Sequence, residues 1–280
     1  MGVKISGKYS EERLSNLGSK KFKRLIGIDK NAFDQAVKVV EQKYQERHRK
    51  GGKPSKFTCY EMVILLLLYL KRYNAMEDMA FEFEVSKSVI CTTIHQTIND
   101  LLSDKRFTLF GAECVKNDCS ENRLLDVTEI RIERPKYNQK KKYSGKKKYH
   151  TMKIQVIKGT KTGFIYEIQI GVGSEHDFHL FKRTFEGSPE NVVYTVDLGY
   201  LGINKIHNNS KIPKKNTKKH KLIEEEKNYN KELAKDRIFI EHTNGWIKRF
   251  KILSTRFRNN LRYFAPISVL ICAFYNFDIA

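Results

Sequence analysis

The stretch RLLDVTEI (123–130) predicts the first strand of a sheet, because it is rich in branched apolar side chains and threonine. It also holds a carboxylate, Asp126, among leucine and valine. Burying an isolated carboxylate costs free energy unless a partner compensates it. We therefore expect a partner for Asp126 in the folded chain.

Three further stretches share this composition and complete the predicted sheet. They are HTMKIQVI (150–157), GFIYEIQI (163–170) and NVVYTVD (191–197), and GTKTG (159–163) joins the first two as a hairpin. HDFHLFKRTFEG (176–187) predicts a helix before the last strand. The order strand, strand, strand, helix, strand, helices predicts an α/β (mixed α+β) fold, with a mixed sheet flanked by helices.

The part of the chain before the sheet predicts helices. Residues 29–47 and 59–72 carry apolar side chains at helical spacing, and Thr58 with Glu61 predicts a capping box at the start of the second helix. Residues 1–28 are basic and weakly patterned, which predicts a partly ordered arm.

Two more helices are predicted over 74–85 and 86–104, with almost no residues between them. This pattern is typical of a helix-turn-helix, whose second helix would carry Lys87 and Gln96 toward DNA. From this segment alone an ordinary helical hairpin is an equally good interpretation.

The net charge of +21 exceeds what solubility requires and predicts a polyanionic partner, most commonly nucleic acid. The cations gather in residues 131–161, which hold Lys146, Lys147 and Lys148, and in residues 205–221. Because both stretches border the predicted sheet, they favour a binding groove over a solvated surface.

Membrane insertion and secretion are not predicted. The N-terminus lacks the apolar core of a signal peptide, and the most apolar run, 62–70, is far shorter than the ~20 residues of a membrane helix. The five cysteines form no CxxC pair, so we expect reduced thiols in a cytosolic protein.

The stretch RIFIEHTNGWIK (237–248) predicts a helix with Arg237, Glu241 and Lys248 on one face. A carboxylate flanked by two cations suits a metal ion beside a phosphodiester. Taken alone, the same pattern is more often a solvated charged face.

Asp197 ends a predicted strand and precedes LGYLG (198–202), whose glycines let the chain turn close to a ligand. If the strands of Asp126 and Asp197 are neighbours and the late helix packs across them, Glu241 joins them at one end of the sheet. Such carboxylates require divalent cations, and oxygen ligands suit Mg²⁺ or Mn²⁺. Two ions would serve phosphoryl transfer.

Five motifs in this order resemble a bacterial insertion-sequence transposase of the DDE superfamily, in the branch related to Harbinger transposases. They are LLDVTEI (124–130), YSGKKKYHTMKIQVI (143–157), GSEHDFHLF (173–181), VDLGYLG (196–202) and Arg237-x3-Glu241-x6-Lys248. The resemblance covers roughly residues 122–276. One departure is Ala234, where related transposases often carry tyrosine three residues before the arginine.

The resemblance implies an RNase H-like core in which Asp126, Asp197 and Glu241 are the catalytic residues and metal ligands. It implies that Lys248 contacts phosphate of the transposon end and that Arg237 helps to set the site. Metal-dependent cutting at terminal inverted repeats, and joining of the 3′ ends to target DNA, would follow. The protein would act on double-stranded DNA as an oligomer, at least a dimer, in the bacterial cytoplasm with the nucleoid.

The expected domains are an arm over 1–28, a helical DNA-binding domain over 29–110 with its helix-turn-helix at about 74–104, and a catalytic domain over 121–280. Two other functions stay open at this stage. One is an inactive or domesticated DNA-binding protein that keeps the fold, and the other is a metal-dependent endonuclease that cuts without integrating.

Overall fold

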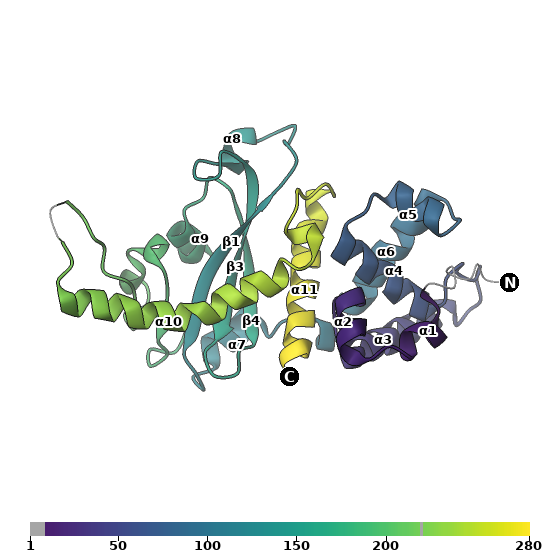
Figure 1. Ribbon diagram of the computed structural model, residues 1–280, viewed down its shortest axis with the longest axis horizontal. Coiled ribbons are helices and arrows are strands. Elements are labelled where there is room, and N and C mark those ends of the chain that lie inside the picture. The colour runs from purple at the N-terminus through teal and green to yellow at the C-terminus, as the bar shows by residue number, and fades with distance from the viewer. Residues whose placement is uncertain (1–8, 219–220) are drawn as a thin grey trace.

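The computed structural model describes residues 9–218 and 221–280. The first eight residues of the predicted arm lie outside this range. The N-terminal helices lie at one end of the molecule, the sheet lies in the middle, and α10 runs past the sheet toward the other end (Figure 1). The predicted mixed fold with flanking helices is confirmed, and it is consistent with an RNase H-like core.

The sheet is mixed and contains every predicted strand. Its strands are β1 (Arg123–Arg131), β2 (Tyr143–Ser144), β3 (Tyr149–Gly159), β4 (Ile165–Val172), β5 (Tyr194–Thr195) and β6 (Ser210–Lys211). The order is β2-β3-β1-β5-β6, and β4 also pairs with β3. β1, β3 and β4 run antiparallel, whereas β5 lies parallel to β1 and β6 parallel to β5.

The parallel pairing of β1 and β5 follows from the helix between β4 and β5. That helix, α9 (Asp177–Thr184), belongs to a crossover that lets the chain return in the same direction. Arg123 pairs with Tyr194 and Leu124 with Thr195 in this register. β1, which holds Asp126, and β5, which precedes Asp197, are therefore neighbours, and this was the condition under which the sequence predicted that the two acids meet.

Seven α-helices precede the sheet in the residues that the structure describes, and α3 to α6 lie where the sequence predicted them. They are α1 (Glu11–Ser15), α2 (Ser19–Ile26), α3 (Lys30–His48), α4 (Cys59–Arg72), α5 (Met76–Glu82), α6 (Lys87–Leu102) and α7 (Gly111–Asn117). The capping box is confirmed, because Thr58 accepts from the backbone N–H of Glu61 while the Glu61 side chain accepts from that of Thr58. Residues 83–86 separate α5 from α6, and base reading by this pair stays a prediction.

Residues 9–28 differ from the predicted arm, because they hold α1 and α2. Phe22 and Ile26 are buried, and Phe22 packs edge-on against Phe33 with ring centroids 5.4 Å apart. The apolar residues were too few to predict a helix from periodicity, yet they suffice to anchor α2 on α3. The predicted domain limits remain a proposal.

After the sheet the chain forms α10 (Glu224–Ile247) and α11 (Phe264–Ile279), and α8 (Gln139–Lys142) lies in the β1–β3 connection. The polar stretch 221–235 and the stretch 237–248 lie mostly within α10, since no glycine or proline separates them. No helix in the described part of the chain is long and apolar enough to cross a membrane.

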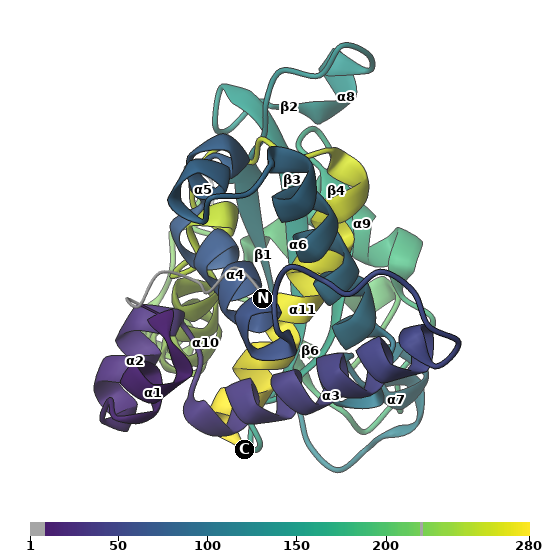
Figure 2. The same ribbon diagram turned by 90° about the vertical axis from the view of Figure 1, so that its right-hand side faces the viewer.

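Two apolar cores cover the two faces of the sheet. The larger core joins the N-terminal helices, α10 and α11 to the face that carries Leu124 and Ile130. The smaller core lies on the face of Leu125 and packs against α9. Viewed from the N-terminal end, α11 lies between the N-terminal helices and the sheet (Figure 2). Asp126 shares the strand face of Leu124, so it faces the side on which α10 packs.

Candidate active site

Asp126 lies in β1 where α10 crosses the sheet, and it has the partner that its burial demands. Its Oδ2 accepts a hydrogen bond of 2.8 Å from Nδ2 of Asn244 on α10. Burial, and then the negative charge of Asp197, raises the pKa of Asp126 to about 6. A neutral amide stabilises this carboxylate less than a cation would, so the site favours an additional positive charge.

Asp197 directly follows Val196 after β5 and begins a short turn over Leu198–Tyr200. Its Oδ1 accepts a 2.8 Å hydrogen bond from the backbone N–H of Gly199. A Cβ atom at Gly199 would lie 2.9 Å from Oδ1 of Asp197 and 2.9 Å from Oδ2 of Asp177. Glycine is therefore needed here, because it lets two carboxylates approach the same backbone position.

One face of α10 supplies the cations of the site. Arg237, Asn244 and Lys248 follow one another at helical spacing, and Arg237 and Lys248 line the same cavity as Asp126 and Asp197. Burial lowers the pKa of Lys248 and so does the charge of Lys147, while Asp126 acts in the opposite direction. The helix therefore brings positive charge to the rim of the acidic group.

Glu241 lies on this helix face but its side chain is turned outward. The side chain is 60% exposed, and its Oε1 lies 3.9 Å from Nη2 of Arg237. Glu241 is not among the residues that line the cavity. Within the described residues, no group of three or more histidine, cysteine, aspartate or glutamate side chains is arranged to hold a metal ion. The structure thus brings two of the three predicted acids together.

The cavity has a volume of about 750 Å³ and mixes both signs of charge. The ionisable side chains that line it are Asp126, Glu129, Lys146, Lys147, Lys153, Glu175, His176, Asp177, Asp197, Arg237 and Lys248. Two of the three predicted lysines of the β1–β3 connection therefore reach the site. Lys148, in a turn with φ 61°, does not line it.

The two predicted DNA-contacting residues on α6 lie outside this cavity. Lys87 forms an exposed ion pair with Glu77, with 3.2 Å between Nζ and Oε2. Gln96 donates a 3.0 Å hydrogen bond to Oδ1 of Asp100 and lines a separate, largely apolar pocket on the N-terminal helices.

The oxygen donors at the site are of the kinds that a hard divalent cation uses. Asp126 and Asp197 supply carboxylate oxygens, and two buried oxygens beside them, Thr128 Oγ1 and Asn244 Oδ1, have no hydrogen-bond partner. Carboxylate, amide and hydroxyl oxygens are the donor types that Mg²⁺ and Mn²⁺ use.

Three side chains at the site were not singled out by the sequence pattern. Asn244 is the first, although its position on the face between Arg237 and Lys248 could have shown it. The other two are Asp177 and Lys153, which form an ion pair with 2.7 Å between Nζ of Lys153 and Oδ1 of Asp177. Asp177 begins α9, where an acidic residue is common for helix stability alone, and only the fold brings it beside Gly199.

Comparisons with known proteins agree with the elements that build this cavity. Residues 125–276 match a family described as DDE superfamily endonuclease, a range that includes Asp126 and all of α10. The chain is 38% identical over 271 residues to a protein of Microchaete diplosiphon described as "Probable transposase for insertion sequence element IS702". The alignment covers 96% of this chain and 98% of that protein. No solved structure matches significantly.

Proposed function

We propose, from the premise that this chain belongs to the DDE superfamily of endonucleases as a bacterial insertion-sequence transposase, that it cuts DNA at the inverted-repeat ends of its element and joins the freed 3′ ends to a target. The observation that carries the proposal is the pair Asp126 and Asp197. Asp126 lies in β1 and Asp197 follows β5, its parallel neighbour, and both acids line one cavity with Arg237 and Lys248.

Asp126 and Asp197 are the proposed metal ligands, with Mg²⁺ or Mn²⁺ as the cation. Two ions bound there would supply Lewis-acid stabilisation of the attacking and leaving oxygens of an in-line phosphoryl transfer. Asn244 fixes the orientation of the Asp126 carboxylate through its 2.8 Å hydrogen bond.

Glu241 is the proposed third ligand. Its place on α10, between Arg237 and Lys248 on the face that meets the site, supports this role. Its exposed side chain has only a long ion pair with Arg237 to hold it outward. Exposed ion pairs of this kind contribute about 0–1 kcal/mol, so a change of rotamer toward the acidic pair costs little.

The cations of the cavity rim are the proposed contacts for the DNA backbone. The charge of Lys147 lowers the pKa of Lys248, so an anion bound between the two would be favourable. Lys146 lies beside Lys147 at the rim and Lys148 just outside it. The positive charge of Arg237 would attract the carboxylates of Glu241 and Asp126 and so help to position them. Lys87 and Gln96 are proposed to contact DNA from the N-terminal helices.

The proposed substrate is double-stranded DNA, both the terminal repeats and the target. Because two ends must be joined to one target, the proposed active form is an oligomer, at least a dimer. Its proposed place of action is the bacterial cytoplasm, with the nucleoid.

The experiment is cleavage of a labelled duplex that carries the inverted repeats flanking the gene, with a target plasmid and Mg²⁺ or Mn²⁺. We expect nicked ends and joined products with the parent protein, and neither with Asp126→Asn or Asp197→Asn. Glu133→Gln, an exposed carboxylate just after β1, is the matched control and should cut normally.

Each other result changes the conclusion. If Asp126→Asn cuts as well as the parent, the catalytic assignment is wrong. If the parent cuts but yields no joined product, the protein is an endonuclease without integration. If the parent binds the ends and never cuts, it is a DNA-binding protein that keeps the fold.

A further inference from the structure

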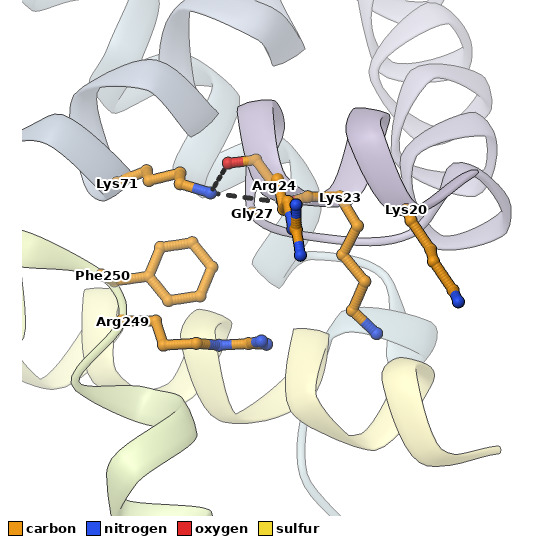
Figure 3. Close-up of a pocket in the computed structure, with 7 residues that line it drawn as sticks. All are labelled: Lys20, Lys23, Arg24, Gly27, Lys71, Arg249 and Phe250. Atoms are coloured by element: carbon orange, nitrogen blue, oxygen red, sulfur yellow. Dashed lines mark hydrogen bonds between the residues drawn. The ribbon is translucent and has the colours of Figure 1, made fainter. Parts of the chain in front are cut away.

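A second basic pocket lies away from the candidate active site, where the N-terminal helices meet the end of α10. It has a volume of about 330 Å³. Its cations come from three segments far apart in the sequence: Lys20, Lys23 and Arg24 of α2, Lys71 of α4 and Arg249 after α10. Figure 3 shows the charged ends of Lys23, Arg24 and Arg249 turned toward a shared space, with Phe250 beside them.

The negative charge at this pocket is too small to balance the cations. Asp278 of α11 pairs with Lys23, with 2.7 Å between Nζ and Oδ2, and with Arg249, with 3.6 Å between Nη2 and Oδ2. In the part of the chain that the structure describes, no carboxylate forms an ion pair with Lys20, Arg24 or Lys71. Asp29 lies near Lys23 and Asp278 and adds a second negative charge, but among the described residues Lys20, Arg24 and Lys71 each lack a paired carboxylate, and five cations still outnumber the acids.

Of the three cations without a paired carboxylate, Lys71 is the most buried. It is half-buried, and its Nζ donates to the carbonyl oxygens of Lys23 and Arg24 at the end of α2 (Figure 3). Burial lowers the pKa of Lys71, and the charges of Arg249 and Arg72 lower it further. The carbonyl oxygens hold the ammonium in place, but they do not neutralise it.

The backbone also keeps this pocket in one shape. Gly27 ends α2 with φ 110°, in the left-handed region, and a Cβ atom there would lie 3.0 Å from Cε1 of Phe250. Phe250 is itself buried against the larger core. α2 therefore ends against Phe250, which follows α10, and its cations lie beside Arg249.

We propose that this pocket binds a backbone phosphate of the DNA duplex on which the protein acts, a contact separate from the catalytic cavity. This inference rests on the proposed function. A phosphate would meet cations that have no partner, and guanidinium and ammonium groups together form the usual phosphate contact.

Duplex DNA fits better than a small anion because the two basic sites are joined by the chain. Lys248 lines the catalytic cavity and Arg249 lines the pocket. Consecutive Cα atoms are 3.8 Å apart, so the end of α10 presents one cation to each site. A duplex held at the cavity can therefore place a second phosphate at the pocket. There α2 and α4 would help fix its direction.

The test measures the salt dependence of binding to a labelled duplex of random sequence, with the full chain. In Lys20→Gln/Arg24→Gln, two exposed cations of the pocket are removed. The matched control is Lys38→Gln/Lys116→Gln, which removes two exposed cations from other surfaces. Each lost phosphate contact should reduce the log–log salt slope by about 0.9. Because the pocket is proposed to hold one phosphate, the pocket variant should lose about that much.

The pocket variant should also bind roughly tenfold more weakly at moderate salt, since a hydrogen bond to a charged group contributes about 1.5–3 kcal/mol. The control should lose much less of both. A second readout is acetylation followed by mass spectrometry, in which the duplex should protect Lys71 and leave Lys38 reactive.

Parental affinity and slope in the pocket variant would overturn the proposal. So would protection of Lys71 by inorganic phosphate with no protection by the duplex, which would make the pocket a small-anion site. The cleavage assay separates this failure from that of the proposed function. If the parent still cuts and joins DNA, only the pocket assignment is lost.

Discussion

The two basic sites of this protein differ in how their charge is balanced. In the candidate active-site cavity, Lys248 and Arg237 line the same space as Asp126 and Asp197, so both signs of charge are present. In the pocket by α2 there are five cations, of which Lys23 and Arg249 pair with Asp278, and Asp29 is the other carboxylate near Lys23. Clustered acids create a demand for metal ions, whereas unbalanced cations create a demand for phosphate. Under the two proposals, the reacting phosphate and a second, unreactive phosphate bind at separate sites.

The largest expected effect concerns which acid, Glu241 or Asp177, joins Asp126 and Asp197 as the third metal ligand. Glu241→Gln should reduce cleavage about a thousandfold or more, because it removes a proposed metal ligand. Asp177→Asn should cost much less, since Asp177 is already paired with Lys153. The measurement is the initial cleavage rate in Mg²⁺ for the two variants. A larger loss in Asp177→Asn would transfer the ligand role to Asp177.

The second prediction concerns pH in the metal-free protein. The pKa of Asp126 is raised to about 6, so between about pH 4 and pH 6 the native state binds more protons than the unfolded state. Stability from this group therefore falls as pH rises through that window, by about 3 kcal/mol in full. Asp126→Asn removes the penalty and should stabilise the protein at pH 7.5 but hardly at pH 4.

Urea unfolding in EDTA at the two pH values measures this difference. Adding Mg²⁺ at pH 7.5 should stabilise the parent and leave Asp126→Asn unchanged, because only the parent keeps the ligand. Equal stability of parent and variant at pH 7.5 would show that the acidic site is not strained without metal.

The third prediction sharpens the role of Asn244. Asn244→Ala should reduce cleavage roughly 10- to 100-fold, the usual loss when a hydrogen bond that orients a metal ligand is removed. It should also raise the Mg²⁺ concentration needed for half-maximal rate. A purely structural role would lower thermal stability and leave that concentration unchanged. Asn244→Asp should recover little, because a further carboxylate repels Asp126.

The smallest expected effect is on the stability of the basic pocket. Lys20 and Arg24 stand four residues apart on α2, where like charges destabilise a helix by about 0.2–0.5 kcal/mol. Lys20→Gln should therefore stabilise the protein slightly while it weakens DNA binding. Thermal unfolding at low salt measures the gain, and high salt should remove it. A loss of stability would mean that Lys20 has a structural role.

Most of the fold could be predicted because it depends on local pattern. The strands around Asp126 and Asp197 were recognisable from their apolar and β-branched residues, and Thr58 with Glu61 marked the start of α4. The helical content of residues 9–28 was missed because only two residues, Phe22 and Ile26, mark the buried face of α2, too few to identify a helix. Phe22 nevertheless packs against Phe33 of α3.

The candidate site was predicted in part for a similar reason. Spacing along α10 placed Arg237, Glu241 and Lys248 on one face, and their order along that face is a property of the helix alone. The rotamer of Glu241 does not follow from the helix alone. The hydrogen bond from Asn244 to Asp126 does not either, because it joins residues 118 positions apart. Those depend on the way in which α10 crosses β1.

Most of the elements, their order and the residues that share a helix face could be predicted from the chain, because they follow from periods of two or 3.6 residues, and the excess of cations follows from composition. Which charges meet depends on how the elements pack. The tertiary structure placed Asp197 beside Asp126 through the parallel pairing of β1 and β5, and it gathered Lys20, Lys71 and Arg249 into one pocket. Charge interactions depend on distance and burial in space, and neither quantity is written in the spacing of residues along the chain.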